Sequence, residues 1–150
     1  VLRVVRELLY TEPQRTGTSI KCALDYLLKV AKRKSVVFII SDFLDQDYWS
    51  SLKVVNRKHD VIGILLYDPA ETDMPDIGLA KVEDPETGEA FWVDTSSKDA
   101  RNRLKKEIQT RQEKFQKETR KIGLDLIPIS TDQDYVEPLM SFFRMREKRY

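Results

Sequence analysis

The stretch Ser35-Val36-Val37-Phe38-Ile39-Ile40-Ser41-Asp42-Phe43 decides the fold class that the sequence predicts. Its first half is a continuous apolar run rich in β-branched residues, and the run ends at a hydroxyl and a carboxylate. Such a run is typical of a strand in a parallel sheet, because helices cover both faces of such sheets. We therefore predict a strand at residues 36–40 that is buried on both faces.

The segments around this strand predict helices and a second strand. Upstream, residues 1–10 and 20–31 carry apolar side chains at helical spacing. Downstream, residues 48–58 predict a shorter helix, and Val61-Ile62-Gly63-Ile64-Leu65-Leu66-Tyr67 predicts a second buried strand. The alternation of helix and strand indicates an α/β fold, a three-layer sandwich with a mostly parallel sheet.

The segment from Ile77 to Thr95 departs from this alternation. Two strand-like runs flank a turn that contains Pro and Gly, which predicts a β-hairpin inserted at about residues 77–95. We interpret its aromatic residues Phe91 and Trp92 as a candidate contact patch for a partner. After the insert we predict a long helix over residues 97–122, a strand over 124–129 and a last helix over 135–149.

Length and composition narrow the class of protein. The 150 residues, 41% of them hydrophobic, suit a single domain over residues 1–150. The formal net charge of +1 predicts no particular partner, and no apolar run is long enough to span a membrane. The single cysteine, Cys22, favours a reducing, cytoplasmic setting. We expect Cys22 to be an inert packing residue on the apolar face of its helix.

Polar residues at two loops are the candidates for chemistry. An Asp that directly follows a buried parallel strand, as Asp42 does, lies at the carboxyl edge of the sheet, where open α/β folds bind ligands. Its carboxylate can hold a divalent cation, or it can bond to the backbone of its own loop. The hydroxyls of Thr16, Thr18 and Ser19 can ligate Mg²⁺, although capping of the following helix also explains any one of them.

Signals for catalysis are weak. The sequence contains no nucleophile elbow, Walker loop or dinucleotide fingerprint, and we expect its one histidine, His59, to be a surface or loop residue. We therefore expect no enzyme activity. The alternative is a Mg²⁺-dependent hydrolase of flavodoxin-like architecture, in which Asp42 and Asp68 hold the cation at adjacent strand ends. The basic residues of the long helix alternate with Glu, so we expect no nucleic-acid binding.

An ordered set of motifs resembles the bacterial domain-of-unknown-function family number 58. The set comprises Thr16-Gly17-Thr18-Ser19, Ser41-Asp42-Phe43, Arg57-Lys58-His59-Asp60-Val61, Tyr67-Asp68-Pro69-Ala70-Glu71, Asp84-Pro85-Glu86-Thr87-Gly88 and Phe142-Phe143-Arg144-Met145-Arg146. Members of that family resemble von Willebrand factor A domains, and their genes commonly neighbour those of MoxR-type AAA+ ATPases. The resemblance implies a non-catalytic interaction or scaffolding module that acts with such an ATPase and its client protein, in complex assembly or metal insertion.

The resemblance also implies a metal-ion-dependent adhesion site. Such sites combine an Asp-x-Ser-x-Ser loop, a Thr from a second loop and an Asp from a third. The Thr matches Thr18, or less well Thr16, and the Asp matches Asp42, with Ser19 and Ser41 as possible neighbours. The Asp-x-Ser-x-Ser loop has no match in the sequence. We expect Mg²⁺ in a full-length parent and weak or no metal binding by this chain.

The same resemblance places the predicted strands in the second half of a von Willebrand factor A-like sheet. The chain is then the C-terminal part of such a domain, and the strand Val36–Ile40 lies at an open edge. An apolar, β-branched edge strand can pair with a strand of another chain. We therefore expect self-association through the Val36–Ile40 edge.

Overall fold

The structure is a computed structural model that describes residues 2–10, 17–69, 75–83 and 88–148. Its elements follow the predicted order of helices and strands. They are α1 (Leu2–Tyr10), α2 (Ile20–Val30), β1 (Val36–Ser41), α3 (Trp49–Lys58), β2 (Asp60–Tyr67), β3 (Leu79–Glu83), β4 (Ala90–Asp94), α5 (Lys98–Ile122), β5 (Asp125–Ser130) and α6 (Val136–Glu147). None of the described helices is long and apolar enough to cross a membrane.

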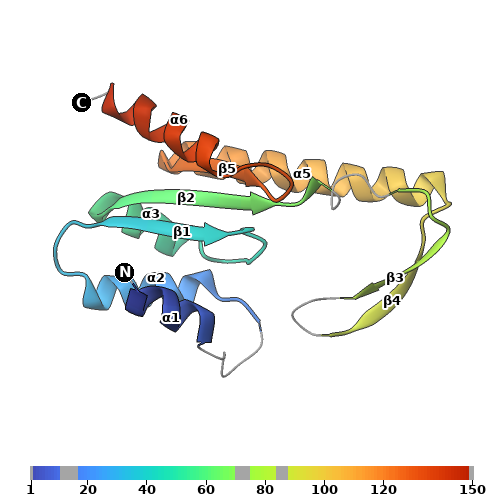
Figure 1. Cartoon of the computed structure of the whole chain (residues 1–150), viewed down its shortest axis with the longest axis horizontal. Helices are drawn as coiled ribbons and strands as arrows, with labels where there is room; N and C mark the ends of the chain where they lie inside the picture. Colours follow the sequence, from blue (N-terminus) through green and yellow to red (C-terminus); the bar gives the residue numbers. More distant parts are fainter. Residues whose placement is uncertain (1, 11–16, 70–74, 84–87, 149–150) are drawn as a thin grey trace.

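The main sheet is parallel, with strand order β1-β2-β5. Residue Val36 of β1 pairs with Asp60 of β2, and Ile62 of β2 pairs with Asp125 of β5. Helices α2 and α3, with the C-terminal part of α5, cover one face, and α6 covers the other (Figure 1). This arrangement confirms the predicted α/β sandwich. The separate hairpin β3–β4 is antiparallel, as predicted.

Alternate residues of the central strand β2 supply the two cores. Val61 packs with residues of α2, α3 and the loop after β1, whereas Ile62 and Ile64 pack with β5 and α6. The neighbouring side chains leave no room for a side chain at Gly63. A Cβ atom at this position would lie 3.0 Å from Leu126 Cδ1 and 3.3 Å from Phe43 Cζ. The two-sided burial predicted for this strand is therefore confirmed.

Ion pairs attach the end of helix α6 to the first residues of β2 and β5. Arg146 Nη2 donates to both carboxylate oxygens of Asp60 at 2.8 Å, and Nη1 lies 3.7 Å from Asp125 Oδ2. The guanidinium is mostly shielded from solvent, so water screens these charge-assisted hydrogen bonds less than it would at an open surface. The pairing fixes the end of α6 over β2 and β5, and Phe143 of α6 also reaches β1, where its ring centroid lies 6.4 Å from that of Phe38.

Strand β1 corrects one expectation, because only one of its faces is covered. Val36, Phe38 and Ile40 are 59%, 47% and 63% exposed. The alternate residues Val37 and Ile39 pack against the core that includes residues of α2 and α3. The physical reason is the position of β1 at the edge of the described sheet, where α6 packs mainly over β2 and β5 and reaches β1 only through the contact of Phe143 with Phe38. Both faces of β1 are apolar, although the described residues bury only one of them.

Two further expectations are corrected. Cys22 is exposed, because Ile20 and Leu24 form the buried face of α2 and Cys22 lies about 200° around the helix from Ile20. His59 is only 2% exposed rather than at the surface. It ends α3 and leads directly into the central strand β2, which carries it inside. Neither ring nitrogen has a hydrogen-bond partner within the described residues.

Candidate functional site at the carboxyl edge of the sheet

The loop after β1 lies at the carboxyl edge of the sheet, and Asp42 is its first residue. The side chain of Asp42 is exposed, and its Oδ1 accepts from Leu44 N at 3.1 Å and from Ser41 Oγ at 3.3 Å. Ser41 Oγ in turn accepts from Phe43 N at 3.0 Å. Asp42 is therefore at the predicted position, and its carboxylate organises the backbone of its own loop.

Two residues of this loop have left-handed backbone conformations without being glycine. Phe43 has φ 57° and Asp47 has φ 61°. Such conformations cost on the order of 1 kcal/mol or more and persist only where the surroundings fix them. The buried ring of Phe43 supplies that restraint, because its centroid lies 5.2 Å from the ring centroid of Phe115 on α5. The loop is therefore held in one shape by the core beneath it.

Asp45 joins this loop to the start of α2. Its Oδ2 accepts from Ile20 N at 2.7 Å, and Ser19 Oγ accepts from Cys22 N at 3.2 Å. Two of the free N–H groups at the first turn of α2 are thereby satisfied. The contact brings the loops that carry Thr18 and Asp42 to the same end of the sheet. Ser19 has the capping role that the sequence left open.

The described donors at this edge are few for a metal ion. A Mg²⁺ ion takes six oxygen ligands in near-octahedral geometry. Among the described residues, no group of three or more His, Cys, Asp or Glu side chains is placed to hold a metal ion. Thr18 and Asp42 are both exposed, and Thr16 lies outside the described residues. Asp68 directly follows β2, so the two carboxylates of the hydrolase alternative do follow adjacent parallel strands.

The end of the same loop is a buried tyrosine. Tyr48 is almost fully enclosed, and its hydroxyl donates to Phe43 O at 3.4 Å. Burial raises the pKa of Tyr48 far above its usual value, and the negative charges of Asp45 and Asp42 raise it further. The phenol therefore stays protonated at any physiological pH. It acts as a structural donor and not as a base.

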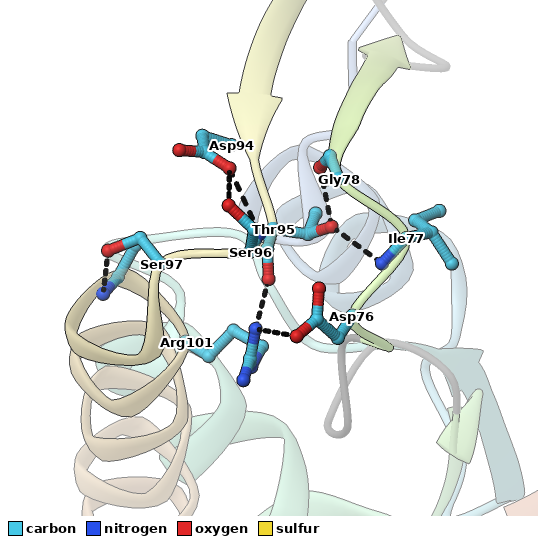
Figure 2. Close-up of polar contacts among 9 residues, drawn as sticks. Asp76, Ile77, Gly78, Asp94, Thr95, Ser96, Ser97 and Arg101 are labelled. Atoms are coloured by element: carbon cyan, nitrogen blue, oxygen red, sulfur yellow. Dashed lines mark hydrogen bonds and ion pairs between the residues drawn. The ribbon is translucent and has the colours of Figure 1, made fainter.

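The hairpin β3–β4 is attached to α5 through a network of polar contacts (Figure 2). Thr95 is buried, and both its N–H and its hydroxyl donate to Gly78 O, at 2.8 and 2.6 Å. The same hydroxyl oxygen accepts from Ile77 N at 3.0 Å. Arg101 of α5 donates to Thr95 O and pairs with Asp76 Oδ2 at 3.2 Å. These contacts set the direction in which the hairpin leaves α5.

The turn between β4 and α5 reinforces this attachment. Asp94 Oδ1 accepts from Ser96 Oγ at 2.6 Å and from Ser96 N at 3.0 Å, and these hydrogen bonds hold the pKa of Asp94 below its usual value. Ser97 Oγ accepts from Ala100 N at 3.3 Å and so caps α5. The hairpin base is thus a defined structure. The sequence predicted only the start of the long helix at residue 97.

The hairpin itself projects beyond the carboxyl ends of β1 and β2 (Figure 1). Phe91 and Trp92 are 55% and 66% exposed, and their role as partner contacts stays a prediction. The register pairs Phe91 with Val82 and Trp92 with Lys81, so the two aromatic side chains lie on opposite faces of the ribbon. Phe91 and Trp92 therefore do not form one continuous patch; each is exposed on its own face of the ribbon.

Comparison with known proteins identifies the family to which the chain is similar. A family model described as protein of unknown function DUF58 matches residues 1–114. An uncharacterized protein of Mycobacterium avium is 28% identical over 129 residues, which are 84% of this chain and 75% of that protein. Uncharacterized proteins of Mycobacterium bovis and Mycobacterium tuberculosis are each 27% identical over 129 residues, which are 84% of this chain but 40% of those proteins. No solved structure matches the chain.

Proposed function

The chain belongs to the DUF58 family of proteins of unknown function, and we propose that it serves as a non-catalytic protein-interaction module. One observation carries this proposal. Large apolar side chains are exposed on two separate surfaces, the outer face of β1 and the hairpin β3–β4. Exposed apolar surface of this kind marks contact sites for other proteins.

The hairpin is the stronger of the two surfaces for a partner protein. A two-stranded ribbon that packs on nothing is marginally stable in water. Here the polar network at Thr95 and Arg101 holds its base, while Phe91 and Trp92 stay exposed. A ribbon that is fixed at its base and exposes Leu79, Phe91 and Trp92 is suited to insertion between surfaces of a partner.

For the partner we propose a MoxR-type AAA+ ATPase together with its client, in complex assembly or metal insertion. This assignment rests on the family resemblance. In a longer parent protein, Thr18 and Asp42 would supply part of a Mg²⁺ site at the carboxyl edge. That site would add a contact to an acidic group of the client or the ATPase.

The test is a binding experiment with a purified MoxR-type AAA+ ATPase. We expect this chain to bind it, and the double substitution Phe91→Ser/Trp92→Ser to abolish binding. The matched control is Tyr26→Ser/Val54→Ser, which removes two exposed apolar side chains from α2 and α3 and should leave binding unchanged. Equal binding by all three proteins, or binding by none, would contradict the proposal.

A further inference from the structure

A cleft of about 820 Å³ lies between the loop after β1 and the middle of α5. One wall is formed by residues 43–49, and the other by α5 residues between Arg103 and Phe115. The lining positions on α5 recur every three or four residues, so a single stripe of the helix faces the loop. The volume falls within the range of ligand-binding clefts in proteins.

The floor of the cleft is aromatic. Trp49 stacks on Tyr48 with ring centroids 4.9 Å apart, and Phe115 lies 5.6 Å from Trp49 and 5.2 Å from Phe43. Phe43 and Tyr48 are buried, whereas Trp49 and Phe115 are partly exposed and line the cleft. The partly exposed rings offer an apolar surface on which a side chain of a ligand can pack.

The rim of the cleft on α5 is cationic. Arg103, Lys106, Arg111 and Lys114 line it, and within the described residues none of these four forms an ion pair. By contrast, Lys121 on the same helix pairs with Glu118. The carboxylate of Asp45, across the cleft, is occupied by the N–H groups of Ile20 and Gln46. Glu107 on α5 and Asp47 on the loop also line the cleft, so its lining carries four cationic side chains against three carboxylates, a formal excess of one positive charge.

The distance over which these cations are spread indicates how long the ligand is. From Arg103 to Lys114 the helix rises about 16 Å, which is the length of about five residues of extended chain. A single phosphate or carboxylate group is far shorter than this. An extended segment with several carboxylates matches the row of charges along its length.

We infer that this cleft binds an extended acidic peptide segment of a partner protein. Carboxylates of the segment pair with Lys106 and Arg111, and one apolar side chain packs on Trp49 and Phe115. This inference rests on the proposed function, because it assigns the chemistry of the partner. The loop after β1 and the part of α5 that line the cleft lie toward the hairpin end of the molecule (Figure 1), so one partner can contact both the cleft and the hairpin.

The test uses a fluorescein-labelled, Glu-rich peptide of about eight residues with a single Phe, long enough to span the row of cations. We expect binding, measured by fluorescence anisotropy at low salt, that weakens as salt is added. Lys106→Glu/Arg111→Glu should weaken binding about tenfold or more, because two attractive pairs become repulsive. The matched control Lys105→Glu/Lys117→Glu changes the same charge on the same helix outside the cleft, and should change binding about twofold or less.

Three outcomes would overturn the inference. They are an absence of binding up to about 1 mM peptide, an equal loss in the two charge-reversal variants, and displacement of the peptide by micromolar ATP. The last would assign the cleft to a nucleotide. A result with the ATPase separates this inference from the proposed function. If Phe91→Ser/Trp92→Ser abolishes ATPase binding and Lys106→Glu/Arg111→Glu does not, the function stands and the cleft plays no part in it.

Discussion

Replacement of Ile40 by Lys tests whether the open edge at β1 drives self-association. Ile40 is 63% exposed on the outer face of β1, beside Val36 and Phe38. Full burial of such a side chain is worth about 1.5–3 kcal/mol, so covering the exposed half of each is worth about 1 kcal/mol. Two copies paired at β1 therefore gain about 6 kcal/mol from the three residues of each chain.

Hydrogen bonds between the two edge strands add to this free energy of association. The translational and rotational freedom that the two chains lose opposes it. About five hydrogen bonds between two edges contribute roughly 1 kcal/mol each. If association costs about 5 kcal/mol, near the low end of its range, about 6 kcal/mol remains. That value corresponds to a dissociation constant of about 40 µM. We therefore expect the chain to be mostly dimeric at about 100 µM.

Ile40→Lys removes about 1 kcal/mol from each copy and adds a charge to both, which weakens the dimer about 30-fold or more. Size-exclusion chromatography with light scattering should then show a monomer at about 100 µM. Val54→Lys is the matched control, because Val54 on α3 is 52% exposed and lies away from the edge. A wild-type chain that stays monomeric at this concentration, or two variants that dimerise equally, would refute the reasoning.

Three further predictions concern single side chains. His59→Leu should leave the free energy of unfolding in urea unchanged or raise it by about 1 kcal/mol, because the buried ring nitrogens lack partners within the described residues; a clear loss would reveal a partner. Asp45→Ala should lower that free energy by about 1 kcal/mol, or about 3 °C in thermal midpoint, because Ile20 N loses its acceptor. Millimolar Mg²⁺ should leave the thermal midpoint unchanged and support no phosphatase activity; activity that disappears in Asp42→Asn would favour the hydrolase alternative.

Local signals explain why the sequence predicted the elements of the fold so closely. Helix α5 begins after Ser97, whose hydroxyl caps it, and ends at Gly123, which has φ 63°. Strand β2 was predicted from one continuous apolar run, and the hairpin from two strand-like runs around a turn. Each of these features is encoded within a few consecutive residues, so a single sequence suffices to find it.

The contacts that build the candidate site were not predictable in the same way. Asp45 caps Ile20 from 25 positions away. The cleft arises because α5 passes the loop after β1, which brings Phe115 against Trp49. His59 is buried by the layers around β2 although nothing in its neighbours marks it as a core residue. Such contacts depend on tertiary packing, which leaves no periodic pattern in the sequence.

The open edge also bears on how the other surfaces are tested. If the isolated chain dimerises through β1, each dimer presents two hairpins and two clefts. A partner with two binding surfaces could then engage both at once and bind more tightly than any single contact allows. Ile40→Lys separates the two effects, because it alters β1 and leaves Trp92 and Arg111 in place. If the hairpin and the cleft are binding surfaces in their own right, a monomeric Ile40→Lys chain should still bind the ATPase and the acidic peptide. Loss of both in that variant would assign them to the edge instead.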